Sequence, residues 1–348
     1  MRVIKSALSS NYSPVGDISL GEREDGDFTS LLRILCNVCE YEELPVRHNE
    51  DIMNKTLEKQ LPIALQDKSK TDISFGGPIT HMEYDDPHCK AFLLLQAHLD
   101  RLPTLPCSDY ITDTNSVLDQ SIRIIQAMLD VCLDKGFLSV SLGLVNLMQC
   151  LKQARWTTDS NLLCLPHITP EMLPEFEYQG QLLDSIAQVK ELSAALPQIL
   201  SKIPGLGRRQ RDDIVSVIKH MPLYDVNVEI LEATRKDTKW MLDCGQKYEV
   251  HVSMKRLGPY RDGFAVYSPR FPKTQTEGYF IILGDPRMNE LLDLRRVSPV
   301  GRRSSDEMSV SFKFVTPAEP GVYHYVLNVM SDGYIGLDQE VDLEWIQS

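Results

Sequence analysis

The stretch ELPVRHNED, residues 43–51, separates two helical patterns and therefore decides how the first part of the chain folds. Its mixture of charged and polar side chains fits either a catalytic site or a turn between helices. Pro45 pushes the preceding residue out of α geometry, which helps to end a helix. Asn49 is a suitable N-cap, and the two acids after it lie where the helix dipole favours negative charge. The stretch is therefore predicted to be a capped corner between helices.

Two side chains of this corner, His48 and Arg47, raise the question of chemistry. His48 has no visible nucleophile or ligand partner, which argues against catalysis. Arg47 is expected to bind a nearby carboxylate or carbonyl and to hold the corner. Elsewhere the chain has no GxxxxGK[ST] nucleotide-binding loop, GxSxG elbow or HExxH motif, so it is not expected to be an enzyme on its own.

The length and composition describe a folded, acidic chain. Its 348 residues suggest two or three domains, and 43% hydrophobic with 24% charged residues is a globular composition. The net charge of -13 argues against a generally basic nucleic-acid coat, although a local basic patch is compatible with it. Neither a membrane span nor a secretory signal is expected. The eight cysteines lie mostly in apolar stretches, which favours reduced core thiols in a nuclear or cytosolic protein.

Helical periodicity runs over residues 28–175 and predicts an all-α bundle with short connections. Its first helix is FTSLLRILCNVCEYEEL, with apolar residues at i, i+3, i+4 and i+7. Further helices are expected from about Asn49, in HCKAFLLLQAHLDRL, over residues 114–135 with Gly136 as the C′ residue, and over residues 140–156. Residues 1–27 are expected to be an irregular N-terminal remnant, whose VIKSAL piece suggests the tail of a helix from a larger protein.

The pattern changes after the bundle. Residues 176–222 are predicted to hold two helices around KIPGLGRRQRDD, in a helix-hairpin-helix arrangement. Residues 223–348 contain seven alternating apolar and polar stretches separated by Gly, Pro and Asp turns. They are predicted to form a β-sandwich of immunoglobulin or fibronectin type, without the Cys–Trp–Cys signature of true immunoglobulin domains. The expected fold class is therefore a multidomain chain, first α and then β.

The sequence CNVC has the CxxC spacing of a metal or redox site. No second CxxC occurs, and Cys39 continues the apolar stripe of its helix. Buried cysteine behaves as a small hydrophobe, so core packing of Cys36 and Cys39 is favoured and no metal site is predicted.

The sequence IPGLGRRQR, residues 203–211, is a sharper candidate for nucleic-acid contact. The two glycines allow a tight turn, and the amides that begin the next helix can hold a phosphate oxygen. The arginines add positive charge beside those amides. A plain helical turn with solvated arginines fits equally well, because two aspartates follow. The candidate residues are Gly205, Gly207, Arg208, Arg209 and Arg211.

The predicted helix over residues 114–135 is apolar on more than one side, as expected for the central helix of a bundle. Its remaining stripe is polar and either faces solvent, which the local pattern favours, or lines a channel. The candidate residues on it are Ser116, Asp119, Gln120 and Arg123. Two basic segments further along, YSPRFPK and LRRVSPVGRRSSDE, are either rim residues of an interaction surface or solubilising loops.

Five motifs occur in a fixed order: ELPVRHNED, DDPHCKAFLLLQAHLDRL, TDTNSVLDQSIRIIQAMLDVC, PRFPKTQTEGYFIILGD and MSDGYIGLDQE. Together they resemble the Sec-sixty-three homology unit of Ski-two-like superfamily-two helicases, over roughly residues 28–345. Within that family the resemblance is closest to the C-terminal unit of a helicase subunit of the activating signal cointegrator complex.

The resemblance implies a non-catalytic accessory unit of an ATP-dependent RNA or DNA helicase. The bundle would form one wall of a single-strand channel, and the helix over residues 114–135 would act as a ratchet. Its polar stripe then becomes the leading channel candidate, although Arg123 stands where archaeal relatives carry a large aromatic; an arginine plane can stack in its place. The hairpin would touch the strand further along, and the sandwich would be a docking surface.

The resemblance also implies partners and cofactors. The partners would be the helicase motor and winged-helix domains, single-stranded RNA or DNA, cointegrator complex subunits and ribosomes in their quality control, with no membrane. ATP and Mg would belong to the motor domains, and this chain would hold no cofactor. The implied location is the nucleus and the cytoplasm. The alternative is a protein-protein interaction scaffold without nucleic-acid contact.

Overall fold

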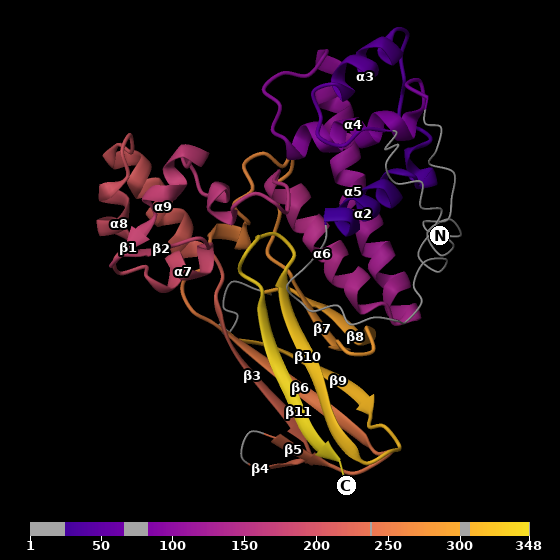
Figure 1. Cartoon of the computed structure of the whole chain (residues 1–348), viewed down its shortest axis with the longest axis vertical. Helices are drawn as coiled ribbons and strands as arrows, with labels where there is room; N and C mark the ends of the chain where they lie inside the picture. The colour runs from indigo at the N-terminus through magenta and orange to yellow at the C-terminus, as the bar shows by residue number, and fades with distance from the viewer. Residues whose placement is uncertain (1–24, 66–82, 237–238, 300–306, 348) are drawn as a thin grey trace. The chain divides into compact units, whose positions relative to one another are not determined.

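The computed structural model describes residues 25–65, 83–236, 239–299 and 307–347, and it divides into two compact units (Figure 1). Unit 1 consists of Met1–Thr157, Pro269–Lys273 and Arg287–Leu291. Unit 2 consists of Thr158–Ser268, Thr274–Pro286 and Leu292–Ser348. The expected irregular remnant, residues 1–27, lies almost wholly outside the described residues. None of the described helices is both long and apolar enough to cross a membrane.

Unit 1 contains a helical bundle, as predicted. Its elements are α2 (Asp25–Cys36), the 3-10 turn η1 (Cys39–Tyr41), α3 (Glu50–Glu58), α4 (Pro87–Leu99), α5 (Ser108–Lys135) and α6 (Leu138–Gln153). Helix α4 contacts the other four helices and is buried at every position from 89 to 97, because most of its side chains are apolar and the polar ones, Lys90 and Gln96, have hydrogen-bond partners. Helix α5, which was predicted to be central, packs against α2, α4 and α6 and bonds to α3 through Tyr110. Both α4 and α5 therefore lie among the other helices of the bundle, and α4 is the more completely buried of the two.

Helix α5 ends where the sequence predicts but begins earlier. Gly136 follows it with a φ of 73°, the left-handed conformation that glycine accepts readily. The expected start was near residue 114, because residues 108–113 have modest helix propensity. Tyr110 and Asp113 in this first part are buried. Tertiary packing therefore extends the helix beyond what local propensity supports.

The corner over residues 43–51 joins η1 to α3, as predicted. Asn49 is the N-cap residue of α3, but its side chain makes no capping hydrogen bond, and its φ of 67° is left-handed. The carboxylate of Glu50 instead accepts a hydrogen bond from the backbone N–H of Arg47 at 2.8 Å. Asparagine tolerates the left-handed region better than most residues, so its conformation, and not its side-chain oxygen, suits this position.

A buried charge cluster holds this corner to the bundle; we call its four side chains, Arg47, Glu50, Lys90 and Asp113, the Lys90 cluster. The Lys90 side chain is fully buried, with its Nζ 2.6 Å from Glu50 Oε2 and 2.7 Å from Asp113 Oδ2. Lys90 Nζ also donates to the carbonyl of Pro45 at 2.7 Å. Arg47 Nη1 donates to Glu50 at 3.0 Å and to Asp113 at 2.6 Å, which confirms the expected role of Arg47.

The Lys90 cluster keeps its carboxylates ionised. Burial raises the pKa of Glu50 and of Asp113, but hydrogen bonds and charge from Lys90 and Arg47 outweigh it, so both pKa values lie below the ordinary range. The carboxylates therefore stabilise the fold above their ordinary pKa, and that contribution is lost as the pH falls through the lowered values.

The helical part of unit 2 is built on a second hydrophobic core. Its elements are η2 (Asn161–Cys164), η3 (Pro170–Glu175), β1 (Glu177–Tyr178), β2 (Gln181–Leu182), α7 (Ile186–Glu191), α8 (Leu196–Lys202) and α9 (Arg208–His220). The apolar residues of η2 pack with those of α7, α8 and α9. Residues 158–175 therefore belong with unit 2 and not with the bundle to which the sequence pattern assigned them. The short α7 has too few residues to give a periodic signal.

The strands of unit 2 form two larger sheets. One has the order β4-β5-β11-β10-β7-β8, from β4 (Thr234–Lys236), β5 (Lys239–Leu242), β11 (Gln339–Gln347), β10 (Gly321–Ser331), β7 (Tyr279–Asp285) and β8 (Glu290–Val297). The other has the order β3-β6-β9, from β3 (Tyr224–Leu231), β6 (Lys247–Arg256) and β9 (Glu307–Val315). The seven predicted strands are all present. The prediction missed β4 and β5, which are too short to alternate visibly.

The two sheets share one core. Val252 and Phe312 of the three-stranded sheet pack with Leu283, Leu327 and Trp345 of the six-stranded sheet. Buried and more exposed positions alternate along β3 and β6, as the polar and apolar alternation predicts, whereas β7 is buried at every position from 279 to 284. The chain is therefore a mixed α and β protein with two packed sheets, while the immunoglobulin or fibronectin type stays a prediction.

The motif MSDGYIGLDQE joins the sheets of unit 2 to its helical part. Tyr334 Oη accepts a hydrogen bond from the backbone N–H of Tyr267 at 3.0 Å. Gly336 has a φ of 78°, and a Cβ there would lie 2.2 Å from Asn161 Nδ2. Asn161 in turn accepts from the backbone N–H of Ile186 at 2.8 Å, at the start of α7. Only glycine fits at residue 336 without moving Asn161.

We expect Lys90→Met to destabilise unit 1 by about 3–5 kcal/mol, because it leaves two buried carboxylates without their cation. Urea unfolding followed by circular dichroism at pH 7 measures the change. The control is Lys59→Met at an exposed position of the same unit, which should change the unfolding free energy by less than about 0.5 kcal/mol. Equal stability of the two variants would contradict the role of the cluster.

His98 gives unit 1 a second pH-dependent contact, between α4 and α6. Its Nε2 donates to the carbonyl of Leu151 at 2.8 Å. Burial, helped by the charges of Arg101 and Arg270, lowers the pKa of His98 to about 4. Between the ordinary pKa of about 6.5 and the lowered one, the unfolded chain binds a proton that the folded chain does not.

We therefore expect His98 to cost unit 1 up to about 3 kcal/mol of stability as the pH falls from 7 to 4. His98→Gln keeps a side-chain N–H donor and does not titrate. The unfolding free energy of the wild type minus that of the variant should be constant above pH 7 and should fall steadily below pH 6.5. A difference that stays flat down to pH 4 would show that His98 is free to be protonated in the folded state.

Candidate nucleic-acid interface

The four candidate residues of α5 lie on one face of the helix, because they are three or four positions apart. Ser116 and Arg123 are exposed, whereas Asp119 and Gln120 are half-buried. The apolar stripe of the same helix is buried, as at Val117. The structure thus brings these four candidates together as a polar strip on the surface of unit 1.

Lys273 joins this strip, although the sequence did not single it out as a site residue. It belongs to Pro269–Lys273 of unit 1, and its Nζ lies 2.8 Å from Asp119 Oδ2. Arg123 Nη2 lies 3.9 Å from the same oxygen. The segment YSPRFPK gave a signal of a basic loop, but nothing in its sequence indicates which helix it contacts.

A second distant segment of unit 1 fixes the end of α5. Asn289 Oδ1 accepts a hydrogen bond from the backbone N–H of Ser139 at 2.9 Å, at the start of α6. Leu291 donates its backbone N–H to the carbonyl of Gly136 at 2.9 Å. The N-cap residue of α6, Phe137, provides no side-chain cap of its own, so Asn289 supplies it.

The second candidate site is the loop between α8 and α9 in unit 2. Gly205 has a φ of 81°, which requires glycine or strain, and Gly207 is the N-cap residue of α9. Leu206 between them is buried in the core of this helical part, while both glycines are exposed. The loop is therefore anchored by its apolar residue and presents its backbone to solvent.

The side chains around this loop divide into two kinds. Arg208 and Arg209 are exposed. Arg211 is half-buried, and its Nε donates to the carbonyl of Leu206 at 3.0 Å, so it supports the loop. Gln210 was missed by the sequence reading: its Oε1 accepts from the backbone N–H of Gly207 at 2.8 Å. A glutamine three residues after the N-cap was the available signal.

Buried cations hold the other end of α9. Lys190 Nζ donates to the carbonyls of Ile218 and Lys219 at 2.7 and 3.0 Å. Arg256 of β6 donates to the carbonyl of His220 at 2.8 Å and pairs with Glu277. Burial, with the nearby Arg256, lowers the pKa of Lys190 to about 8. Cations at a helix C-terminus satisfy its last carbonyls and favour the dipole, so α9 is fixed at the end opposite the candidate loop.

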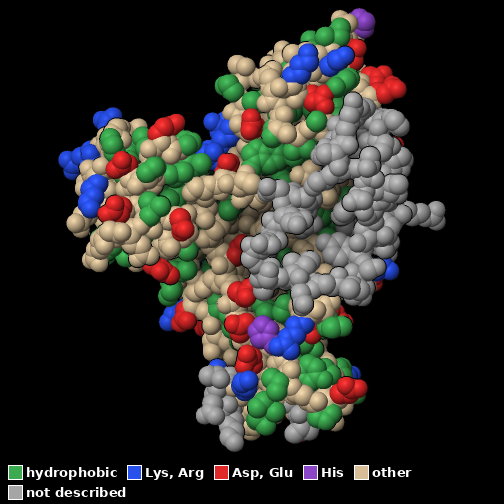
Figure 2. Space-filling model, viewed as in Figure 1, with side chains coloured by type: hydrophobic (Ala, Val, Ile, Leu, Met, Phe, Trp, Pro, Cys, Tyr) green, Lys and Arg blue, Asp and Glu red, His purple; other side chains and the backbone are tan. Residues whose placement is uncertain are grey.

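Basic and acidic side chains are interspersed on the face of the molecule seen in Figure 2. Both basic and acidic side chains are visible there on the part of unit 2 that holds α8 and α9. The candidate surfaces are thus local sets of cations on an acidic chain with a net charge of -13.

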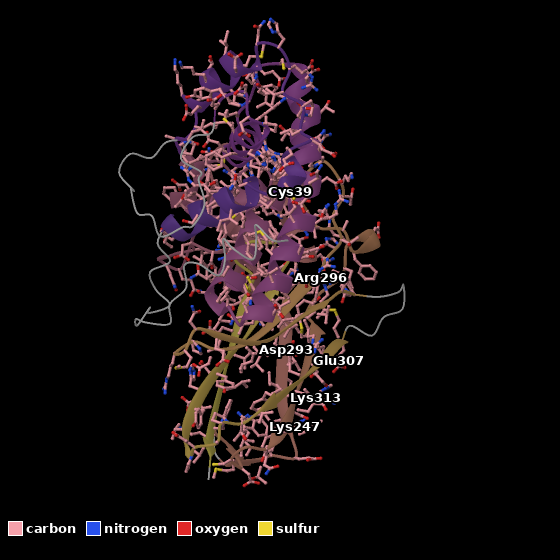
Figure 3. The ribbon with its side chains drawn as sticks, turned by 90° about the vertical axis from the view of Figure 1, so that its right-hand side faces the viewer. Cys39, Lys247, Asp293, Arg296, Glu307 and Lys313 are labelled. Carbon is pink, nitrogen blue, oxygen red and sulfur yellow. The ribbon has the colours of Figure 1, made fainter. Side chains whose placement is uncertain are left out.

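The CxxC pair differs from the prediction. Cys36 is buried at the end of α2, and burial raises the pKa of its thiol well above the ordinary range. Cys39 is exposed in η1 (Figure 3), so the prediction that it packs in the core was wrong. Helix α2 ends before Cys39, and the chain turns that side chain outward. Among the described residues, no group of three His, Cys, Asp or Glu side chains is placed to hold a metal ion.

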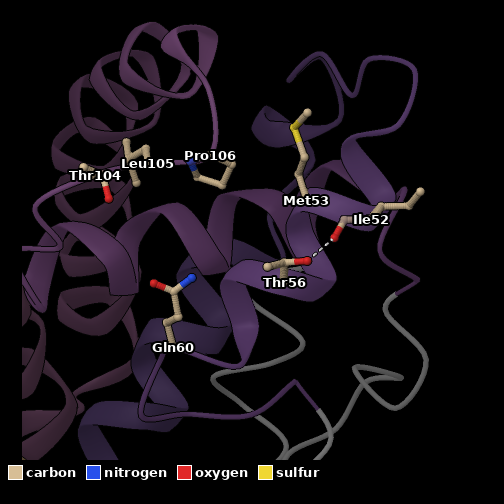
Figure 4. Close-up of a pocket in the computed structure, with 7 residues that line it drawn as sticks. All are labelled: Ile52, Met53, Thr56, Gln60, Thr104, Leu105 and Pro106. Carbon is tan, nitrogen blue, oxygen red and sulfur yellow. Dashed lines mark hydrogen bonds between the residues drawn. The ribbon is translucent and has the colours of Figure 1, made fainter.

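A shallow hollow of about 230 Å³ lies beside α3 (Figure 4). Its lining comes from α3, from the turn just after it and from the chain between α4 and α5: Ile52, Met53, Thr56, Gln60, Thr104, Leu105 and Pro106. Small-molecule sites usually enclose about 300–1,000 Å³ and place polar groups around the ligand. The lining here has no charged side chain, and the hollow is smaller, so it does not resemble such a site.

Comparisons with known proteins agree with the order of the motifs. The family model described as "Sec63 Brl domain" matches residues 19–344. "Activating signal cointegrator 1 complex subunit 3" of Bos taurus is 37% identical over 355 residues, which cover 90% of this chain and 15% of that protein. "U5 small nuclear ribonucleoprotein 200 kDa helicase" of Drosophila melanogaster is 31% identical over 334 residues, which cover 95% of this chain and 14% of that protein.

The chain thus spans about 15% of the length of the curated relatives it matches. Among solved structures, the CARDB domain of the PF1109 protein from Pyrococcus furiosus covers 36% of this chain and 96% of its own at 18% identity. Its TM-score is 0.21, too low to support a fold assignment. The family model, in contrast, extends over both units, and the chain belongs to the Sec63 Brl domain family.

Proposed function

We propose that the chain is a non-catalytic accessory unit of an ATP-dependent RNA or DNA helicase. In this role it guides single-stranded nucleic acid past the motor domains and offers a docking surface to proteins. Support comes from the family match and from a relative whose name is that of a helicase. ATP and Mg would then bind to the motor domains, and this chain would act through binding alone.

The polar strip on α5 carries this proposal. It is a row of partly exposed side chains, Ser116, Asp119, Gln120 and Arg123, on a helix whose other side is buried in the bundle. A single strand needs a surface for stacking and backbone contacts with little sequence preference. The Arg123 plane can stack on a base, and the side chains of Ser116 and Gln120 can donate hydrogen bonds to sugar or phosphate oxygens.

The loop between α8 and α9 is proposed as the second contact, in a helix-hairpin-helix arrangement over residues 176–222. The amides that begin α9 and the exposed side chains of Arg208 and Arg209 suit a phosphate group. The N–H of Gly207 already bonds to Gln210, so the following amides of the first turn are the proposed donors. Arg211 is assigned to support of the loop.

The β-sandwich, residues 223–348, is proposed to be of immunoglobulin type and to bind proteins. Met241, Ile346 and Val322 lie in register on β5, β11 and β10, and the last two are exposed apolar side chains. This apolar row also favours the alternative function, a protein scaffold without nucleic-acid contact. The proposed partners are motor and winged-helix domains, cointegrator complex subunits and ribosomes, and the proposed location is the nucleus and the cytoplasm.

Binding to a fluorescein-labelled single-stranded oligonucleotide of about 15 residues separates the two functions. We expect weak binding by anisotropy that falls as salt rises. The double variant Arg208→Ala/Arg209→Ala should bind more weakly, with the slope of log K against log [salt] reduced by about 1.4 for two lost phosphate contacts.

The matched control is Lys247→Ala/Lys313→Ala, which removes two exposed cations of the same unit from β6 and β9 (Figure 3). It changes the net charge equally and should leave the slope nearly unchanged. No salt-dependent binding by the unaltered chain would favour the scaffold. The same slope in both double variants would show that the loop makes no contact with the strand.

A further inference from the structure

If the polar strip binds a single strand, as the proposed function states, the presence of Asp119 on it needs an explanation. A carboxylate repels the phosphate groups of a nucleic acid, so an acid in the middle of a strand-binding surface needs a reason. The side-chain atoms around Asp119 supply one: two cations approach the same carboxylate oxygen, Lys273 Nζ at 2.8 Å and Arg123 Nη2 at 3.9 Å. We call these three side chains the Asp119 cluster.

The Asp119 cluster is an exposed charge arrangement and contrasts with the buried Lys90 cluster. The side chains of Lys273 and Arg123 are 66% and 74% exposed, and that of Asp119 is 39% exposed. Exposed ion pairs contribute little to stability, typically about 0–1 kcal/mol. The cluster is therefore not needed to hold the fold, and an incoming anion can replace the carboxylate as the partner of Lys273 at small cost.

Contacts around Lys273 fix the backbone of its segment, while its side chain is mostly exposed. Phe271 is buried in unit 1, and the prolines at 269 and 272 restrict the backbone on either side of it. The lysine side chain has a flexible four-carbon stem that ends in a compact charge. Lys273 can thus transfer its Nζ from Asp119 to a nearby anion without a change in the segment.

We propose that Lys273 is a phosphate-binding residue of the α5 strip and that Asp119 restrains it when no strand is present. The ligand is the phosphodiester backbone of a single-stranded nucleic acid. On binding, Nζ of Lys273 moves from Asp119 to a phosphate oxygen, and Arg123 contacts the same strand. Asp119 is then a competitor of the phosphate, in place of the strand-binding role that the sequence suggested for it.

Substitution of the acid and substitution of the lysine of the Asp119 cluster are expected to have opposite effects on oligonucleotide binding. Lys273→Gln should weaken binding of the labelled oligonucleotide and reduce the slope of log K against log [salt] by about 0.7, the value for one lost contact with a single strand. Asp119→Asn should strengthen binding, because it removes a repulsive charge and weakens the hold of residue 119 on Lys273. Lys273→Arg keeps the charge and should keep the slope. Lys313→Gln is the control for loss of one exposed cation elsewhere.

Amine acylation provides a readout that a purely structural role of Lys273 would not change. The intact chain is treated with an N-hydroxysuccinimide acetate, and acetylation at each lysine is followed by mass spectrometry. We expect saturating oligonucleotide to slow acetylation of Lys273 but not of Lys313. In the free chain, Asp119→Asn should speed acetylation of Lys273, because the ion pair no longer holds the amine.

The outcomes separate this inference from the proposed function. If the unaltered chain binds no single strand, both are overturned. If the chain binds and Arg123→Gln weakens binding, while Lys273→Gln behaves like Lys313→Gln and Lys273 is not protected, only the role of Lys273 is overturned. If Asp119→Asn weakens binding, Asp119 contacts the strand directly and the competition with phosphate is wrong. Circular dichroism should show unchanged unfolding for all five variants of the four residues, because each residue is partly or fully exposed.

Discussion

The fold of unit 1 depends on the burial of one ammonium group. Removing a charge from water is costly unless it is paired and hydrogen-bonded, and Lys90 lies on the most buried helix of the bundle. Its partners come from different elements: Pro45 from the corner, Glu50 from the start of α3 and Asp113 from α5. Each of these elements has to be in place for the charge to be satisfied. The cluster thus favours one arrangement of three helices over other packings of the same apolar stripes.

Unit 2 also contains buried cations that are paired and hydrogen-bonded. Arg256 and Lys190 are buried, and their donors are directed at Glu277 and at the last carbonyls of α9. The cations come from a strand and from α7, so the charge requirement joins the sheet to the helices. Each unit therefore has a buried, internally paired charge cluster. The candidate binding residues, such as Arg123 and Arg208, are exposed and more loosely held. The buried clusters and the candidate binding residues therefore have different roles, because only exposed charges can exchange one partner for another.

Local signals in the sequence were enough for much of this fold. The prolines, glycines and alternating apolar residues predicted the bundle, the two-layer sheets and the turn at Gly136, because each acts within a few residues. What could not be predicted depends on pairs that are distant in sequence. Lys90 looks like an ordinary helix residue until Glu50 and Asp113 are placed beside it. The contact of Lys273 with Asp119 has no local signal, and the outward turn of Cys39 depends on where its helix ends. The order of motifs along the chain, in contrast, was specific enough to identify the family.

The cap that Asn289 places on α6 has a consequence for biosynthesis. Its oxygen bonds to Ser139, 150 positions earlier in the chain. At translation rates of about 5–20 residues per second, roughly 8–30 s separate the appearance of these two residues. Throughout that interval the nascent bundle has helix α6 without its cap and the end of α5 without the contact from Leu291. The order in which a ribosome delivers the chain therefore leaves the turn between α5 and α6 as one of the last parts of unit 1 to become complete.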